Sequence, residues 1–367
     1  MLLLGALEGC RPPSDRIDFP RLRLDTSRTT AITVCTRPFR AEGPRLDVER
    51  IGSKTVVHNY GHGGSGWSLS WGSAYEALER ALATGEHDIA VIGCGAIGLT
   101  SALLLQRGGA QVTIYAKEMP PNVRSSLATG VWSPDSRICL AKNATPAFKQ
   151  TWEGMARYSY RTYQSLLGLP GDPIEYFDNF FVPEVGSGVI RRNESTDGRP
   201  PFAQLVPDLL SDLGPGRKTY SPGTHPFGER TLQRETWMMF NINAYTRLLI
   251  SDYLAAGGRM EIVEFKSPAD LLRLRQRTLV NATGYGARTL FGDESVIPVR
   301  GQVARTVPQD NIRYGLFHKD VAFVPRRDGF VFQFVGDSDY YGYGDDTTIP
   351  DPAEAERAIR TIVGLFA

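Results

Sequence analysis

The stretch Ile89–Gly98 decides the fold of this chain, and it reads Ile-Ala-Val-Ile-Gly-Cys-Gly-Ala-Ile-Gly. Its four leading apolar residues predict a buried strand, and the apolar residues that follow the glycines, through Leu105, predict a helix. Val112–Tyr115 predicts the next strand. Strand, glycine turn, helix and strand together have the length of one βαβ unit, which indicates an α/β fold.

The glycines of this turn form the pattern GxGxxG, and they are Gly93, Gly95 and Gly98. In a βαβ unit the first allows the tight turn, the second lets a pyrophosphate approach the backbone, and the third lets helix and strand pack closely. The free N–H groups and the dipole at the helix start favour a phosphate. The alternative is a purely structural turn, but the strand before it and the helix after it favour dinucleotide binding.

An acidic residue that binds the ribose is expected where the second strand of such a unit ends. Ala116 and Lys117 occupy that place, and Glu118 follows slightly late. Glu118 is equally well interpreted as a solvent-exposed surface charge.

Length and composition set further limits. The 367 residues suggest two domains, and a net charge of +1 gives no reason to expect nucleic acid or an anionic membrane as a partner. The four cysteines contain no CxxC pair, so neither a zinc site nor a disulfide framework is expected. His58 and His62 are four residues apart, but the glycines around them favour a loop and a structural or cofactor-contacting role, so no metal is expected.

The N-terminal segment Met1–Cys10 is apolar and ends in Leu-Glu-Gly-Cys. That ending resembles a lipoprotein cleavage box without its charged leader, whereas a loose lead or a misplaced start codon is the simpler interpretation. No apolar run reaches the roughly 18 residues of a transmembrane segment. We therefore expect a cytoplasmic protein, with export or lipid anchoring as the alternative.

The most specific stretch is Val56–Trp71, which reads Val-Val-His-Asn-Tyr-Gly-His-Gly-Gly-Ser-Gly-Trp-Ser-Leu-Ser-Trp. It closely resembles the C-terminal signature of the D-amino-acid oxidase and glycine oxidase family. Four shorter segments resemble other motifs of that family, namely Arg-Pro-x-Arg, the flavin loop Ala-Ala-Gly-x-Trp-x-Pro, Asn-Cys-Thr-Gly and Arg-Gly-Gln. These segments are Arg37–Arg40, Ala128–Pro134, Asn281–Gly284 and Arg300–Gln302.

The resemblance implies a Rossmann-like FAD-binding domain and a β-rich, α+β substrate domain. It also implies an FAD-dependent oxidase that removes a hydride from a D-amino acid or a glycine-like amino acid or amine. Deamination follows, and oxygen accepts the electrons to give hydrogen peroxide. The alternatives are a flavin dehydrogenase with another acceptor and a flavin-binding protein without turnover. The oligomeric state stays open.

The order of the motifs differs from the family. The segment that resembles the family's ending precedes the GxGxxG unit, and only Thr84–Asp88 separates them, which is the pattern of a circular permutation. We expect an FAD-binding domain over residues 37–141 and 231–292. The substrate domain would then comprise residues 26–36, 142–230 and 293–367, after an N-terminal lead over residues 1–25.

The resemblance also implies roles for single residues at the substrate. Arg37 would pair with the substrate carboxylate, its alternative being a structural surface ion pair, and the Gly64 carbonyl would accept a hydrogen bond from the substrate amine. Vertebrate-type oxidases place two tyrosines over the substrate, where this chain has His318 and Ala322. Tyrosine or phenylalanine substitutes could come from Tyr314, Phe317, Tyr340 and Tyr341.

Matched positions also imply a set of FAD-binding residues from the phosphate loop, the second strand, the flavin loop, the Asn-Ala-Thr-Gly turn and the His-Gly-Gly loop. Lys266 would contact the adenine through its backbone only. The set comprises Gly93, Gly95, Ala96, Ile97, Gly98, Ala116, Lys117, Arg124, Ser125, Thr129, Gly130, Val131, Lys266, Ala282, Thr283, Gly284, Gly63, Gly64, Gly66, Trp67 and Ser68.

Overall fold

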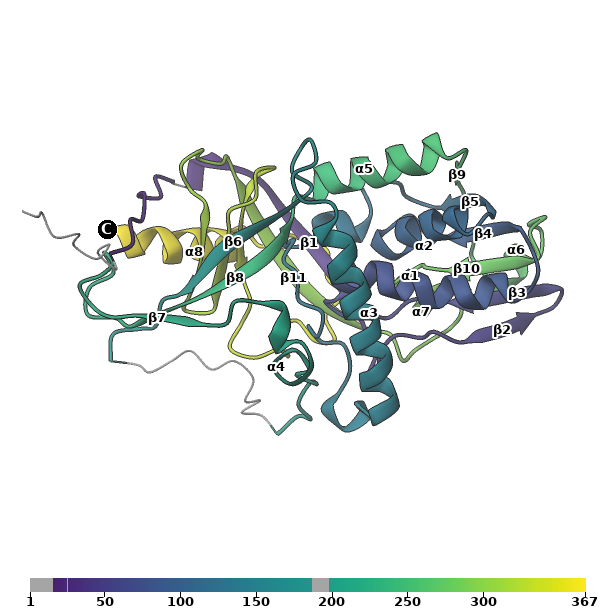
Figure 1. The fold of residues 1–367 in the computed structure, drawn as a ribbon, viewed down its shortest axis with the longest axis horizontal. Coiled ribbons are helices and arrows are strands. Elements are labelled where there is room, and N and C mark those ends of the chain that lie inside the picture. The colour runs from purple at the N-terminus through teal and green to yellow at the C-terminus, as the bar shows by residue number, and fades with distance from the viewer. Residues whose placement is uncertain (1–15, 25, 187–197) are drawn as a thin grey trace, which may run out of the picture.

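The computed structural model describes residues 16–24, 26–186 and 198–367. Two sheets lie at opposite ends of an elongated molecule (Figure 1). One sheet has six strands and the other has eight.

The six-stranded sheet contains the βαβ unit. Its strand order is β2 (Val48–Ile51), β3 (Lys54–His58), β10 (Thr278–Asn281), β4 (Asp88–Ile92), β5 (Gln111–Ala116) and β9 (Arg259–Ile262). All neighbours pair in parallel except β2 with β3.

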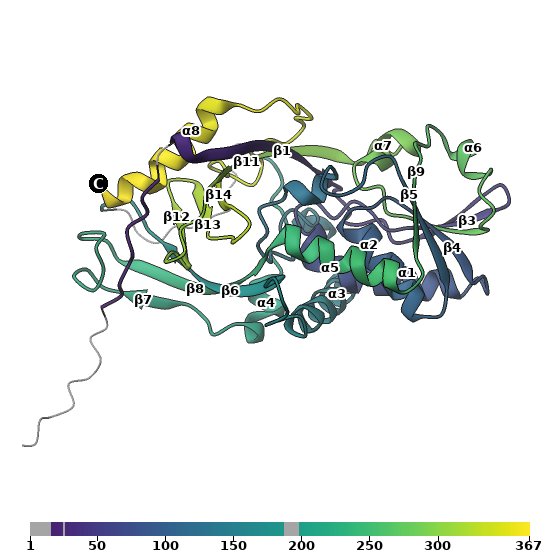
Figure 2. The ribbon, with the colours of Figure 1, turned by 90° about the horizontal axis from the view of Figure 1, so that it is seen from above.

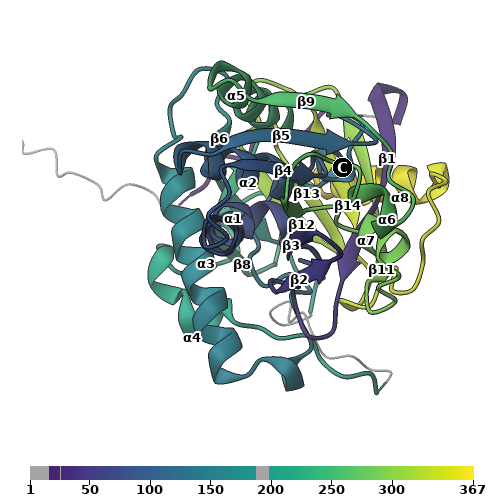
Figure 3. The ribbon, with the colours of Figure 1, turned by 90° about the vertical axis from the view of Figure 1, so that its right-hand side faces the viewer.

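Helices cover both faces of this sheet (Figure 3). On one face lie α1 (Gly66–Leu82), α2 (Ala96–Arg107) and α5 (Ile242–Ala255), and on the other α6 (Pro268–Leu271) and α7 (Gly286–Leu290). Val91 packs toward the first group, and its neighbours Ala90 and Ile92 pack toward the second. The strands are therefore apolar on both sides, as parallel strands between two helical layers require.

The eight-stranded sheet is mostly antiparallel, with β12 and β6 as its parallel pair. Its strand order is β1 (Thr29–Phe39), β11 (Ile297–Thr306), β14 (Phe330–Phe334), β13 (Val321–Val324), β12 (Tyr314–His318), β6 (Ile174–Phe181), β8 (Leu232–Phe240) and β7 (Lys218–Tyr220). Helix α8 (Pro352–Val363) covers one face, where Ile359 and Ile362 pack with Phe323 (Figure 2). The other face is left for the functional site.

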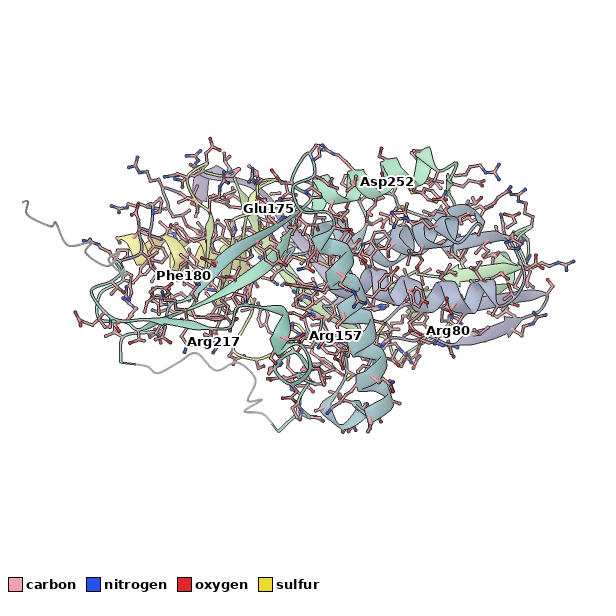
Figure 4. All side chains as sticks on the ribbon, in the orientation of Figure 1. Arg80, Arg157, Glu175, Phe180, Arg217 and Asp252 are labelled. Atoms are coloured by element: carbon pink, nitrogen blue, oxygen red, sulfur yellow. The ribbon has the colours of Figure 1, made fainter. Side chains whose placement is uncertain are left out.

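Helix α3 (Pro146–Gln164) packs against α1 between the two sheets (Figure 1). Thr145 caps it by accepting a hydrogen bond from the Phe148 N–H at 3.2 Å. Arg157, labelled in Figure 4, pairs with Asp212 at 2.8 Å and so ties α3 to the segment after α4 (Val206–Leu209).

The expected α/β class, with a Rossmann-like unit and a second, β-rich part, is confirmed. Element bounds differ in places. The apolar pattern of residues 73–83 predicts a helix, and α1 begins seven residues earlier, at Gly66. The Pro- and Gly-rich residues 170–230 predict no regular element, and β6 begins there. The boundary expected after residue 36 falls inside β1, and β8 belongs to the eight-stranded sheet.

The expected N-terminal lead also differs from the structure. Residues 1–15 lie outside the described part, but Phe19, Leu22 and Leu24 pack into the apolar cluster under α8. Among the described residues, no helix has the length and apolar character needed to cross a membrane.

Candidate cofactor and substrate site

A cavity of about 840 Å³ lies between the two sheets. The ends of β4, β5 and β10 line one part, and the uncovered face of the eight-stranded sheet lines the other. It brings together most of the residues expected at the cofactor and the substrate.

The glycine turn at the start of α2 lines the cavity. A Cβ atom at Gly98 would lie 2.0 Å from the Gly93 carbonyl oxygen, so only glycine allows this close packing. Ala96 N–H donates to Ser125 Oγ at 3.0 Å, whereas the N–H groups of Ile97 and Gly98 have no acceptor in the described part of the chain. Open backbone donors at a helix start suit the pyrophosphate of a dinucleotide.

The end of β5 lines the cavity where the ribose and adenine would lie. Ala116, Lys117 and Glu118 all contribute, and Val263, Glu264 and Phe265 face them. The expectation for Lys266 is wrong, because its backbone N–H donates to Asp270 at 2.9 Å and it does not line the cavity. Lys266 lies beyond the end of β9, which ends at Ile262, and so is not the strand position that the resemblance implied.

The flavin loop exposes a row of backbone donors. The N–H groups of Thr129, Gly130 and Val131 point to no acceptor within the described residues, and all three residues line the cavity. The loop is anchored on β8, where Phe240 N–H donates to the Gly130 carbonyl at 2.8 Å. Such fixed donors can bind the polar edge of a ring system.

The His-Gly-Gly loop and the start of α1 supply a second row of backbone N–H donors. A Cβ atom at Gly63 would lie 2.0 Å from the Arg137 carbonyl oxygen, so this loop packs directly on the chain that follows the flavin loop. The first N–H groups of α1, those of Gly66, Trp67 and Ser68, have no acceptor among the described residues. Together with the helix dipole they favour negative charge at this end of the cavity.

A buried hydrogen-bond chain fixes this loop. The Asn59 amide donates to the Ser73 carbonyl at 3.1 Å, so its Oδ1 accepts from Ser73 Oγ at 2.5 Å. Ser73 Oγ must then accept from His62 Nε2, at 2.6 Å. Burial lowers the pKa of His62 to about 3, so the ring stays neutral. His58 is equally buried and bonds Glu49 at 2.9 Å, so the two histidines face different partners.

Arg37 projects from β1 into the cavity. Its Nη1 donates to the Arg300 carbonyl at 3.1 Å, and no carboxylate of the described chain lies within ion-pair distance. Burial lowers the pKa of the guanidinium. A bound anion would offset that effect, so the site suits a carboxylate.

The wall opposite the flavin loop is apolar. Phe317 and Ala322 face each other across β12 and β13, and both line the cavity with Trp237 from β8. The expectation for His318 is wrong: it points to the other face of β12, where Nδ1 bonds the Val182 carbonyl at 2.7 Å. Side chains alternate along a strand, so Phe317 and His318 cannot share a face.

The aromatic residues considered as substitutes for the two tyrosines over the substrate also differ in whether they line the cavity. Tyr341 lines the cavity with Phe317, whereas Tyr314 and Tyr340 point elsewhere and bond the carbonyls of Pro20 and Pro200.

Sequence reasoning missed two residues of the cavity. Trp237 lines the cavity, whereas its neighbours Met238 and Met239 are core residues. Gln333 accepts a hydrogen bond from Thr129 Oγ1 and so joins the eight-stranded sheet to the flavin loop. The signal for Gln333 is a lone polar residue in the apolar strand Phe330–Phe334.

The arrangement therefore has backbone donors for a pyrophosphate, backbone donors at both ends of a polar ring, and the part-buried Arg37 cation beside an apolar wall. Such a cavity can hold a dinucleotide against a small anionic molecule.

Comparisons with known proteins agree with this geometry. The sequence profile described as FAD dependent oxidoreductase matches residues 88–367. The D-amino-acid oxidase of Rubrobacter xylanophilus is 28% identical over 278 residues, which cover 74% of either chain. That of Streptomyces coelicolor is 27% identical over 286 residues, covering 76% of this chain and 78% of the relative. The glycine oxidase structure from Bacillus cereus is 15% identical, with a TM-score of 0.49 and coverages of 75% and 77%.

Proposed function

Because the chain belongs to the family of FAD-dependent oxidoreductases and uses FAD as its cofactor, we propose that it oxidises the CH–NH2 group of an amino acid. The preferred substrate is a D-amino acid or a glycine-like amino acid, and oxygen is the acceptor. The imino acid product hydrolyses to a keto acid, and oxygen yields hydrogen peroxide. When bound, FAD would accept the hydride from the substrate Cα, which is chemistry that no side chain supplies.

The observation that carries this proposal is Arg37. Its part-buried guanidinium lines the cavity and has no carboxylate of the described chain within ion-pair distance, so a ligand carboxylate can take that place. Its planar fork matches a carboxylate in two parallel hydrogen bonds. A substrate held there would lie between the apolar wall at Phe317 and the donors at Thr129–Val131.

The other residues act by position. The Gly64 carbonyl would accept a hydrogen bond from the substrate amine, which aims the Cα–H bond at the ring. The neutral His62 holds the Gly63–Gly64 segment, and the apolar side chains of Phe317, Ala322 and Trp237 exclude water. Alignment of this kind contributes several kcal/mol to a two-reactant step, about 7–11 in the best intramolecular cases.

The test begins with the purified protein. We expect it to be yellow and to release FAD on acid denaturation, since the resemblance gives no cysteine for a covalent flavin bond. D-amino acids, glycine, N-methyl amino acids and L-amino acids are then screened for oxygen uptake and peroxide release. Dye reduction without oxygen uptake would indicate a dehydrogenase instead. Bound FAD that no amino acid reduces would contradict the proposal and favour a flavin-binding protein without turnover.

A further inference from the structure

Arg326 is a fully buried cation on the far side of the flavin loop from the cavity. It follows β13 directly and has 0% exposure. Its Nη1 donates to the Ala128 carbonyl at 2.9 Å and to the Thr129 carbonyl at 3.3 Å. Its Nε and Nη2 pair with Asp328 at 2.8 and 2.5 Å.

The two carbonyls belong to the peptide units whose N–H groups have no acceptor among the described residues, and Thr129 and Gly130 both line the cavity. The Ala128 carbonyl shares its peptide unit with the Thr129 N–H, and the Thr129 carbonyl shares its unit with the Gly130 N–H. A donor on the carbonyl polarises the unit, so its N–H becomes a stronger donor. Arg326 can therefore act on a ligand of these N–H groups without contacting it.

Close packing makes this link rigid. A Cβ atom at Gly130 would lie 3.1 Å from Arg326 Cδ and Nη1 and 2.7 Å from the Phe240 carbonyl. Gly130 also has φ +87°, a conformation that disfavours other residues. The loop therefore has little freedom to move away from the guanidinium.

A second cation acts on the same loop. Arg305 Nη2 donates to the Ser126 carbonyl at 3.0 Å. Burial, and next the positive charge of Arg326, lower the pKa of Arg305. Asp328 is the carboxylate paired with Arg326, so two guanidinium groups and one carboxylate leave the loop in a positive potential.

We propose that Arg326 sets the electron affinity of bound FAD by strengthening the Thr129 and Gly130 N–H donors and by its own charge. This rests on the proposed placement of the FAD ring against residues 129–131. Two-electron reduction adds negative charge to that ring, and fixed donors and positive charge favour it. Arg326 is thus a positioning residue, and Asp328 attenuates its effect.

The test compares midpoint potentials of FAD-saturated variants, measured by reductive titration against a reference dye. In Arg326→Met the ratio of reduced to oxidised FAD at fixed potential should fall about tenfold, which is a shift of about 30 mV to more negative values. In Asp328→Asn the Arg326 charge is no longer neutralised, so the potential should shift to more positive values. A purely structural role would not give opposite signs.

Arg327→Met is the matched control. Its guanidinium pairs with Glu175, labelled in Figure 4, at 2.6 Å on the outer surface, and the potential should not change. If Arg326→Met does not fold, the sign of the potential shift in Asp328→Asn decides alone. Unchanged potentials, or shifts of the same sign in both variants, would overturn the inference. The amino acid screen of the wild type tests the proposed function separately, because the potentials are measured without substrate.

Discussion

The Nη1 atom of Arg37 donates to the backbone carbonyl of Arg300 at 3.1 Å, and the same guanidinium lies where a side chain at position 301 would have to be. A Cβ atom at Gly301 would be 2.3 Å from Nη1 and 2.4 Å from Nη2. The Arg37 guanidinium on β1 therefore occupies space that β11 leaves open only because residue 301 is glycine. Its orientation is fixed before any ligand binds, which reduces the entropy cost of binding.

Arg37→Lys should weaken substrate binding, because an ammonium cannot form the two parallel hydrogen bonds of a guanidinium. We expect kcat/KM to fall by a factor that corresponds to about 2–5 kcal/mol of lost transition-state stabilisation. The FAD content should be unchanged. Steady-state kinetics and the visible spectrum measure the two quantities. Arg50→Lys, on the exposed strand β2, is the control. Wild-type kinetics in Arg37→Lys would refute the assigned role.

Gly98→Ala should abolish FAD binding. The added Cβ would meet the backbone oxygen of Gly93 at 2.0 Å, so the start of α2 must move away from the turn that receives the pyrophosphate. The ratio of flavin to protein absorbance measures the loss. Gly154→Ala, inside α3 with no atom within 4 Å of the new methyl group, should keep FAD and gain about 0.5–1 kcal/mol of stability. Full FAD content in Gly98→Ala would mean that the phosphates bind elsewhere.

The glycines of the phosphate loop could be identified without any resemblance, because local geometry alone determines their role. The turn at Gly93–Gly98 needs its glycines wherever the unit occurs, so its place in the cavity was predictable. Trp237 and His318 depend instead on which face of a strand meets the cavity. That face is set by pairing of β8 and β12 with β6, which lies in another part of the sequence, and a shift of one residue reverses it. Arg326 is a harder case, because its role follows from contacts with carbonyls about 200 positions away.

His62 should make the protein less stable in acid. Burial lowers its folded pKa to about 3, whereas an unfolded histidine titrates near 6.5, so between these values the unfolded state binds more protons. The stabilisation is complete above pH 6.5 and is lost as the pH falls toward 3, by up to about 1.4 kcal/mol per pH unit. His62→Gln should reduce the slope of unfolding free energy against pH between 4 and 6, measured by denaturant titration with FAD in excess. His87→Gln, at an exposed position, should keep the wild-type slope, and an unchanged slope in His62→Gln would count against the assignment.

The circular permutation stays a prediction, and the ends of the described chain make it testable. Phe19 and Phe366 both pack against Phe227, with ring centroids 4.8 and 5.4 Å away, so the two ends lie close together. At the other junction, α1 ends at Leu82 and β4 begins at Asp88 within the same six-stranded unit.

A gene that encodes residues 87–367, a linker and then residues 16–84 would restore the motif order of the family. We expect its product to fold and to bind FAD with a linker of about eight Gly and Ser residues, whose r.m.s. span is about 15 Å. The free energy of unfolding should change by only a few kcal/mol, because loop-closure entropy varies slowly with length.

As a control, new ends between Ser73 and Ala74 would interrupt α1 at two buried residues, and that product should not bind FAD. Absorbance near 450 nm and urea titration compare the chains. If the rearranged chain binds no flavin at any linker length, the natural order of the segments is required for folding. The permutation hypothesis then loses its structural basis.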